Sequence, residues 1–310
     1  MKKVFIDGRA GTTGLRIYER LEARKDIELI ILSDDDRKNP DKRKAAINSA
    51  DIAFLCLPDA ASIDAVSMIE NDNTVVIDTS TAHRTLEGWA YGFPELSEAF
   101  ESKIKSSKRI AVPGCHASGF IALVYPLIKA GALSNEALLT CHSLTGYSGG
   151  GKNMIADYES DGRDALLDAP RQYGITQSHK HLKEMSAITG INNMPLFSPI
   201  VSDFYSGMEV TVPLFKSMLN DGFGIDEIRK IYSETYNSDI VKYEESLDNN
   251  GFISAAKLCG KDSMRVTVCG NEDRMILVAV YDNLGKGASG AAVECMNIVL
   301  GAEKTFGLVI

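Results

Sequence analysis

The sequence of 310 residues lacks the features that mark several large classes of protein. It has no apolar run of the ~18 residues needed to cross a bilayer, so it contains no predicted transmembrane helix. Lys and Arg together number 33 against 42 Asp and Glu, a formal net charge of −9. This acidic balance argues against broad attraction to nucleic acid or to an anionic membrane. Any anionic ligand must therefore be held by a local group of basic side chains.

Cysteine is scarce and its spacing is not that of a disulfide framework or a zinc module. The six cysteines lie far apart and form no CxxC pair. The N-terminal residues enter a β-type apolar run directly, without a long apolar signal segment. We therefore expect a protein of the reducing cytoplasm. Its 45% hydrophobic and 24% charged residues are ordinary for a globular chain of this length, which has room for two domains.

The first segment with clear organisation is a β-type run followed by a glycine-rich turn. Val4–Asp7 predicts a strand, and Leu15–Arg24 has helical spacing of apolar residues. Between them lie Gly8, Gly11, Thr12, Thr13 and Gly14. Glycines at such a turn let the backbone approach a pyrophosphate, whose charge the N–H groups of the new helix and the threonine hydroxyls can receive. The segment predicts a nucleotide-binding loop, although its GxxGxxG spacing is not the commoner GxGxxG.

Further apolar runs repeat the same alternation. They cover Ile27–Leu32, Ile52–Leu57, Thr74–Ile77 and Ile110–Val112, and Ala60–Glu70 between them has a helical face. Strands buried on both faces have this composition. The sequence predicts a Rossmann-type, doubly wound parallel sheet, in which ligands bind at the carboxyl ends of the strands.

The residues after the second strand leave the nicotinamide cofactor undecided. The carboxylates of Ser33-Asp-Asp-Asp36 suit a ribose hydroxyl, as in NAD sites, whereas Arg37 and Lys38 suit the 2′-phosphate of NADP. A solvated charged loop without a ligand is the third interpretation.

Cys115 stands where a reactive thiol is expected. It follows the β-type run Lys108–Gly114 and precedes Phe120–Ile128, which has helical spacing. A thiol in the first turn of a helix faces the positive end of the helix dipole, which lowers its pKa and favours the thiolate. The alternative is a buried structural cysteine.

From about Glu136 the pattern changes to alternating strands. They cover Ala137–Thr145, Met208–Leu214, Met264–Cys269 and Met275–Tyr281, the last two joined by the turn-forming pair Gly270-Asn271. Ala288–Leu300 has helical spacing. We expect an α/β chain with a Rossmann-type domain over 1–114, completed by a returning C-terminal helix in 285–310, and an α+β domain with a mixed sheet over 115–284.

Two polar segments of this second part have chemical potential. His179 and His181 lie two residues apart, with Glu184 three residues later, and a histidine beside Cys115 would supply the base and acid that thiol chemistry needs. Zinc ligation and surface histidines without a role are the alternatives. Gly146–Lys152 nearly matches a phosphate loop, but Asn153 replaces the magnesium-binding hydroxyl and disfavours an NTPase.

Seven motifs spread over the chain form one pattern. They are Asp7-Gly8-x-x-Gly11-Thr-Thr-Gly14, Val76-Ile-Asp-Thr-Ser-Thr-Ala-His-Arg84, Tyr91-Gly-Phe-Pro-Glu-Leu96, Pro113-Gly-Cys115, Gly146-Tyr-Ser-Gly-Gly-Gly-Lys152, His179-x-His181 and Asp282-Asn-Leu-Gly-Lys-Gly-Ala-Ser-Gly290. Across essentially the whole chain, the set resembles the shorter (type 2) form of N-acetyl-γ-glutamyl-phosphate reductase, within the superfamily of aspartate-semialdehyde dehydrogenase.

The resemblance implies a cytoplasmic, NADPH-dependent enzyme of arginine biosynthesis. It would convert an acyl phosphate, N-acetyl-L-glutamyl 5-phosphate, to the 5-semialdehyde and phosphate, without a metal and as a homodimer or homotetramer. It maps the nucleophile onto Cys115 and the acid/base onto His179-x-His181, of which we prefer His181. It favours NADP, for which the candidate contacts are Gly8, Gly11, Thr12, Thr13, Gly14, Ser33, Arg37, Lys38, Asn283 and Gly287. Candidate cations for the substrate are Arg84, Lys152 and Arg171, because such groups pair phosphate and carboxylate.

Three other functions remain open from the residues. An aspartate-semialdehyde dehydrogenase would share fold and mechanism, a regulatory protein would bind NADP without turnover, and a thiol hydrolase would leave the glycine loop idle. The role of His116, directly after the nucleophile, is unexplained.

Overall fold

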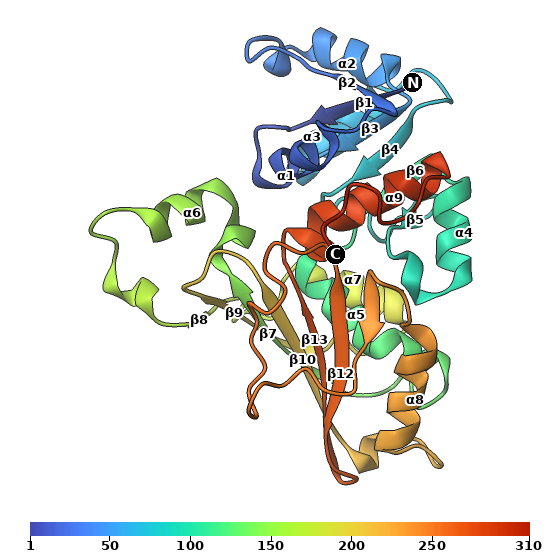
Figure 1. Ribbon diagram of the computed structural model, residues 1–310, viewed down its shortest axis with the longest axis vertical. Helices are drawn as coiled ribbons and strands as arrows, with labels where there is room; N and C mark the ends of the chain where they lie inside the picture. Colours follow the sequence, from blue (N-terminus) through green and yellow to red (C-terminus); the bar gives the residue numbers. More distant parts are fainter. The chain divides into compact units, whose positions relative to one another are not determined.

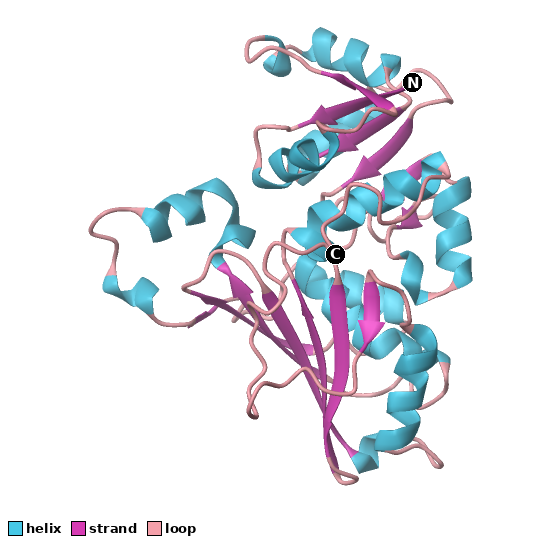
Figure 2. Ribbon diagram, viewed as in Figure 1, coloured by secondary structure: helices cyan, strands magenta, loops and turns pink.

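A computed structural model describes all residues, Met1–Ile310. They form two compact units (Figures 1 and 2), one of residues 1–114 with 288–309 and one of residues 115–287 with residue 310. The chain thus leaves the first unit after Gly114, and it returns at Ala288 rather than at the expected residue 285. We still predict that the first part binds NADP and that the second part carries catalysis and oligomerisation.

The first unit contains a six-stranded sheet in which every neighbouring pair of strands is parallel. The strand order is β2-β1-β3-β4-β6-β5. The strands are β1 (Lys2–Asp7), β2 (Ile27–Ile30), β3 (Ile52–Leu55), β4 (Val75–Asp78), β5 (Ala90–Tyr91) and β6 (Arg109–Ala111). The helices are α1 (Thr12–Leu21), α2 (Pro40–Ser49), α3 (Asp59–Ser67), α4 (Glu98–Ser106) and α9 (Gly290–Leu300). The predicted doubly wound sheet with its returning helix is confirmed.

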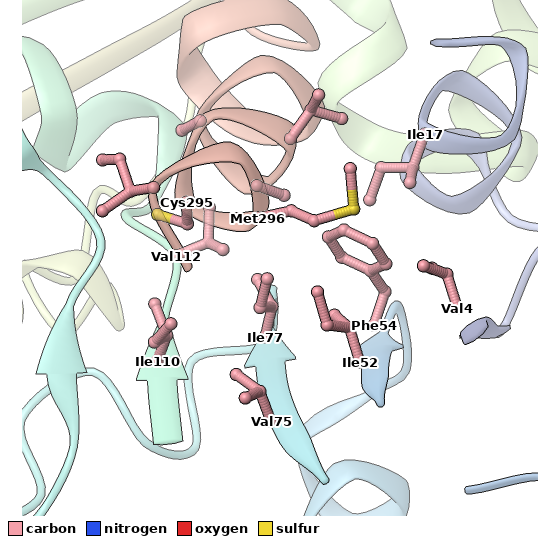
Figure 3. Packing of buried hydrophobic residues seen from close by; sticks show 14 of the residues in the cluster. Val4, Ile17, Ile52, Phe54, Val75, Ile77, Ile110, Val112, Cys295 and Met296 are labelled. Atoms are coloured by element: carbon pink, nitrogen blue, oxygen red, sulfur yellow. The ribbon is translucent and has the colours of Figure 1, made fainter. Parts of the chain in front are cut away.

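Helices cover both faces of this sheet. Apolar residues of α1, α4 and α9 pack on one face, and those of α2 and α3 pack on the other. Figure 3 shows Cys295 and Met296 of α9 packed among Phe54, Ile77 and Ile110 of the strands. Full burial of each such side chain stabilises the fold by about 1.5–3 kcal/mol. A helix from the end of the chain therefore completes the core of its first part.

The second unit contains a seven-stranded mixed sheet in the order β11-β12-β13-β10-β7-β9-β8. Its strands are β7 (Thr140–Gly146), β8 (Arg171–Gln172), β9 (Leu196–Ser202), β10 (Met208–Phe215), β11 (Val241–Tyr243), β12 (Met264–Gly270) and β13 (Arg274–Tyr281). Its helices are α5 (Cys115–Lys129), α6 (Gly151–Glu159), α7 (His181–Thr189) and α8 (Ile225–Thr235). β12–β13 and β10–β13 pair antiparallel, whereas β7–β9 and β11–β12 pair parallel, so the predicted mixed sheet is confirmed.

The long helix α5 packs on β10, β13 and α7, and it contains Pro126. Proline has no N–H, so the carbonyl of Ala122 one turn earlier loses its helical donor. The hydroxyl of Tyr236 donates to that carbonyl at 2.7 Å and replaces the missing bond. The helix thereby continues through its proline.

Short helical turns connect the larger elements. They are 3₁₀ turns at Asp36–Lys38, Pro94–Leu96, Tyr147–Gly150, Ala165–Asp168 and Lys216–Met218, and a π-helical turn at Gly285–Ser289 directly before α9. No helix of the structure is long and apolar enough to span a membrane.

Candidate active site

Cys115 is the first residue of α5, as the sequence predicts, and its side chain is partly exposed. The hydroxyl of Tyr281 ties down this first turn: it accepts the Gly119 N–H at 3.0 Å and donates to the Cys115 carbonyl at 2.5 Å. Gly287 packs directly against Cys115, because a Cβ placed on it would lie 3.2 Å from the Cβ of Cys115. The thiol therefore stands at a helix N-terminus that is fixed by contacts from β13 and the following turn.

The two predicted histidines lie together, and the structure adds a third. His181 is the first residue of α7, which packs against α5. The ring centroids of His179 and His181 are 4.7 Å apart, and the His116 centroid lies 6.0 Å and 5.6 Å from them. The backbone N–H of His181 donates to His179 Nδ1 at 3.2 Å. The unexplained His116 thus belongs to the same cluster as the predicted acid/base pair.

Burial keeps two of these rings neutral. It lowers the pKa of His179, with a further contribution from the charge of Lys180. It lowers the pKa of His116 to about 3, helped by the neighbouring His179. At neutral pH these two rings are therefore uncharged and take part in hydrogen bonds instead of acting as fixed cations. No three His, Cys, Asp or Glu side chains converge as metal ligands.

His116 is hydrogen-bonded at both nitrogens. Nδ1 lies 2.6 Å from Ser143 Oγ of β7, and Nε2 lies 2.6 Å from the hydroxyl of Tyr173, the residue after β8. Burial and then the charge of Cys115 raise the pKa of both Tyr173 and Tyr281. A negative charge on Cys115 therefore favours the protonated form of both phenols.

The three candidate substrate cations differ in their surroundings. Arg171, on β8, donates from Nη2 to Tyr158 Oη at 3.0 Å, while its buried Nε has no partner. Lys152 is exposed on α6. Arg84 lies in the first unit, is buried, and donates to the carbonyls of Val112 and Thr79 at 2.8 and 2.9 Å. Of the three cations, Arg171 stands closest in the sequence to Tyr173, which hydrogen-bonds to His116.

The first unit has a cavity of about 500 Å³ at the carboxyl end of β1. Its lining includes the predicted Gly8, Arg37 and Lys38, together with Arg9, Arg43 and Asp34. Gly8 has a φ of +85°, and a Cβ there would lie 2.2 Å from the Cys56 carbonyl oxygen. Only glycine fits this turn.

No side chain caps the N-terminus of the helix that follows this loop. α1 starts after Gly11 with no side-chain cap and no acidic residue in its first turn, where the half-buried Thr12 and Thr13 lie. Gly14 is equally constrained, since its Cβ would lie 2.4 Å from the Gly8 carbonyl oxygen. Free N–H groups at a helix start fit the pyrophosphate of a dinucleotide.

Four cations and two carboxylates set the charge of this cavity. Arg37 pairs with Asp34 at 3.1 Å, and Arg43 pairs with Asp7 at 2.8 Å. Arg9 lies over the ring of Tyr18, 4.9 Å from its centroid. The predicted Ser33 instead accepts the Asp36 N–H at 3.1 Å. Arg9 and Arg43 were not predicted; the basic excess fits a phosphorylated ribose.

The remaining candidates, Asn283 and Gly287, belong to the second unit. The buried amide of Asn283 accepts the Gly207 N–H at 2.9 Å and donates to Ser148 Oγ at 3.0 Å. Both bonds connect separate loops of the unit, a structural role that the motif did not predict. Gly287 has the packing role against Cys115 described above.

Known proteins match this chain over nearly its whole length. Residues 115–283 match the semialdehyde dehydrogenase dimerisation domain, and residues 36–104 match the semialdehyde dehydrogenase NAD binding domain. The N-acetyl-γ-glutamyl-phosphate reductase 2 of a Nostoc species is 42% identical over 99% of both chains, and the reductase of Allorhizobium ampelinum is 45% identical over 97% of this chain and 99% of its own. The chain belongs to the N-acetyl-γ-glutamyl-phosphate reductase family. The family expected from the seven motifs is confirmed.

Solved structures of a related family share the fold of this reductase-family chain. Aspartate semialdehyde dehydrogenase II of Vibrio cholerae superposes with a TM-score of 0.75 at 17% identity, covering 97% of this chain and 98% of that one. The Candida albicans enzyme, solved with NADP, gives 0.67 at 14% identity, covering 99% of each chain. At such identities the likeness concerns the fold.

Proposed function

We propose that this chain reduces N-acetyl-L-glutamyl 5-phosphate to N-acetyl-L-glutamate 5-semialdehyde and phosphate, with NADPH, in arginine biosynthesis. Membership of the reductase family supports the substrate. The observation that carries the chemistry is Cys115 at the start of α5, which packs against α7 and its first residue, His181. An aspartate-semialdehyde dehydrogenase is disfavoured, because its solved members are only 14–17% identical to this chain.

The thiol acts as the nucleophile of this mechanism. His181 takes the proton of Cys115, and the thiolate attacks the acyl carbon, breaking the bond to the phosphate oxygen and forming a thioester. NADPH, when bound, supplies the hydride that reduces the thioester carbon. The C–S bond then breaks to release the aldehyde, and His181 returns a proton to the sulfur. Backbone N–H groups in the first turn of α5 stabilise the oxyanion of both tetrahedral species.

The cavity of the first unit is the proposed NADPH site. The turn at Gly8 and the free N–H groups of α1 suit the pyrophosphate. Arg37, Lys38 and Arg9 suit the 2′-phosphate, which distinguishes NADP from NAD. Arg84, Lys152 and Arg171 stay candidates for the anionic groups of the substrate.

We also propose a cytoplasmic homo-oligomer, a dimer or a tetramer. The family model that matches 115–283 is that of a dimerisation domain. Strands of this unit expose apolar side chains, including Leu196, Phe215 and Ile276, which are 56%, 60% and 43% accessible. Apolar side chains of this size are commonly covered at an interface between subunits.

The deciding experiment follows NADPH formation in the reverse direction. N-acetylglutamate semialdehyde, phosphate and NADP⁺ are given to the wild type and to Cys115→Ser, with aspartate semialdehyde as the competing substrate. We expect phosphate-dependent turnover, a loss of at least ~10⁴-fold in the variant because the nucleophile is gone, and unchanged cofactor binding. A preference for aspartate semialdehyde would replace the substrate proposal, and cofactor binding without turnover would favour a regulatory protein.

A further inference from the structure

His116, directly after the nucleophile, has no part in the proposed mechanism. Its ring is 3% exposed, and both nitrogens are engaged at 2.6 Å, one with the hydroxyl of Ser143 and the other with that of Tyr173. A buried polar side chain with two short hydrogen bonds holds its neighbours in a defined geometry. Those neighbours come from 27 and 57 residues away in the sequence.

Burial determines where the protons of this chain of groups lie. Ser143 is fully buried, and the Nδ1 atom of His116 is the one hydrogen-bond partner of its hydroxyl. Leaving a buried O–H without an acceptor is costly, so Ser143 donates to Nδ1. The neutral imidazole then carries its single proton on Nε2, which donates to the oxygen of Tyr173. The phenol proton of Tyr173 is consequently directed away from His116.

Cys115 directly precedes His116, whose ring hydrogen-bonds to Tyr173, and so belongs to the same cluster of side chains as that phenol. The charge of Cys115 acts on Tyr173 and on Tyr281, and both phenols stay protonated at neutral pH because their pKa values are raised. Tyr281 already donates its proton to the Cys115 carbonyl. Of these two phenols, Tyr173 therefore has the proton that is available to a ligand on the sulfur.

We propose that Tyr173 is a catalytic hydrogen-bond donor to the oxyanion that forms on the carbon attacked by Cys115, and that His116 and Ser143 are its positioning residues. The inference rests on the proposed function. The phenol keeps its proton throughout, so it stabilises charge and transfers nothing. A donor of this kind lowers the barrier for both tetrahedral species.

Other ionisable groups surround this donor. His179 lies 6.1 Å from the Tyr173 ring, between centroids, and His181 lies 5.6 Å from the His116 ring. Glu184 of α7 acts on Tyr281. The variants below leave all three in place, so a changed pH profile reports on the Tyr173 phenol and its partners.

The first experiment measures turnover and the burst of phosphate released when Cys115 is acylated. We expect Tyr173→Phe to lower kcat by about 10²-fold with little change in KM, as for loss of an oxyanion donor. His116→Gln keeps an N–H at the position of Nε2 and should stay within about 5-fold of the wild type, whereas His116→Leu should fall as far as Tyr173→Phe. Thermal unfolding of each variant reports whether it folds. Tyr173→Phe at the wild-type rate, or Gln no better than Leu, would overturn the inference.

The second experiment needs no substrate and separates this inference from the proposed function. The rate of Cys115 alkylation by iodoacetamide, followed against pH, gives the pKa of the thiol. Because the phenol proton also faces the free thiolate, Tyr173→Phe should raise that pKa, and His116→Gln should leave it near the wild-type value. If the wild type does not release phosphate from the acyl phosphate, the proposed function fails and this profile decides the inference. An unshifted profile in Tyr173→Phe would then reject it.

Discussion

The proposed nucleotide cavity of the first unit and the thiol site of the second are both suited to anions. Different kinds of groups would stabilise the negative charge in the two places. In the cavity the contacts are backbone N–H groups at a glycine turn and four cations, of which Arg37 and Arg43 are paired with carboxylates. At the thiol site they are a helix start and neutral, buried side chains that hydrogen-bond one another. A cofactor whose phosphates stay charged throughout the reaction suits the first arrangement. A charge that exists only during the reaction suits the second, because neutral groups do not pair with the reactants beforehand.

The strongest way to break the thiol site is to remove its proposed proton carrier, His181. We expect His181→Gln to lower kcat by about 10²–10⁴-fold, the usual contribution of general acid–base catalysis. His179→Gln is the matched variant, because His179 lies two residues away in the sequence and is half-buried. It should lower kcat much less than His181→Gln does. Steady-state turnover measures both. The reverse ranking would move the proton carrier to His179.

Within the cavity, NADPH affinity should depend most on the backbone turn at Gly8. Gly8→Ala places a Cβ 2.2 Å from the Cys56 carbonyl oxygen and should weaken NADPH binding by about 100-fold, because the turn can no longer present its N–H groups. Gly88→Ala is the control: Gly88 has nearly the same φ, +84°, but no atom lies within 4 Å of its Cβ position. Both variants carry the left-handed strain of about 1–2 kcal/mol. Equal loss of NADPH affinity in both, measured by fluorescence titration, would contradict a binding role for the turn.

Loss of a cation from the cavity should weaken cofactor binding less than loss of the turn, and it should affect NADPH but not NADH. Arg37→Gln should raise the Kd for NADPH by about 10-fold and leave that for NADH unchanged, since only NADPH carries the 2′-phosphate. Asp34→Asn releases Arg37 from its pair and should not weaken NADPH. The NADPH effect should shrink in high salt, because exposed charges are screened. A parallel change for NADH would place Arg37 elsewhere in the site.

The uncharged state of buried His116 should affect how the free energy of unfolding depends on pH. Its folded pKa of about 3 lies below the ordinary 6.5, so folding favours the uncharged ring. This preference makes its full contribution to the free energy of unfolding above pH 6.5. The contribution is lost as pH falls from 6.5 toward 3, at about 1.4 kcal/mol per pH unit. Urea unfolding at several pH values should therefore show a shallower acid loss in His116→Gln than in the wild type. Identical slopes would mean that His116 is charged in the folded protein.

The sequence predicted the parts of the structure whose signals are local. The helix start at Cys115 and the glycine turn at Gly8 follow from a few adjacent residues, and both are where the pattern puts them. Helix α2 was not predicted, although Asn39, whose side chain caps Asp41 and Lys42, and Pro40 form a helix-start signal.

The partners that define each site could not be predicted in the same way. His116 meets Ser143 and Tyr173, and Arg43 meets Asp7 from 36 residues away. No periodicity or spacing links such pairs, because packing of the finished fold brings them together. The role of a side chain was therefore predictable where its chemistry lies in one motif, and unpredictable where the chemistry depends on a partner.

The packing of α9 has a consequence for how the protein is made. The apolar face that includes Ala292, Cys295 and Met296 belongs to the core of a sheet whose strands all precede residue 112. During synthesis the segment 115–287 emerges in full before that face exists, so the second unit can close its core while one side of the first unit's sheet still lacks the part of its cover that α9 supplies. The unit whose strands are translated first thus depends for its complete core on the helix that is translated last.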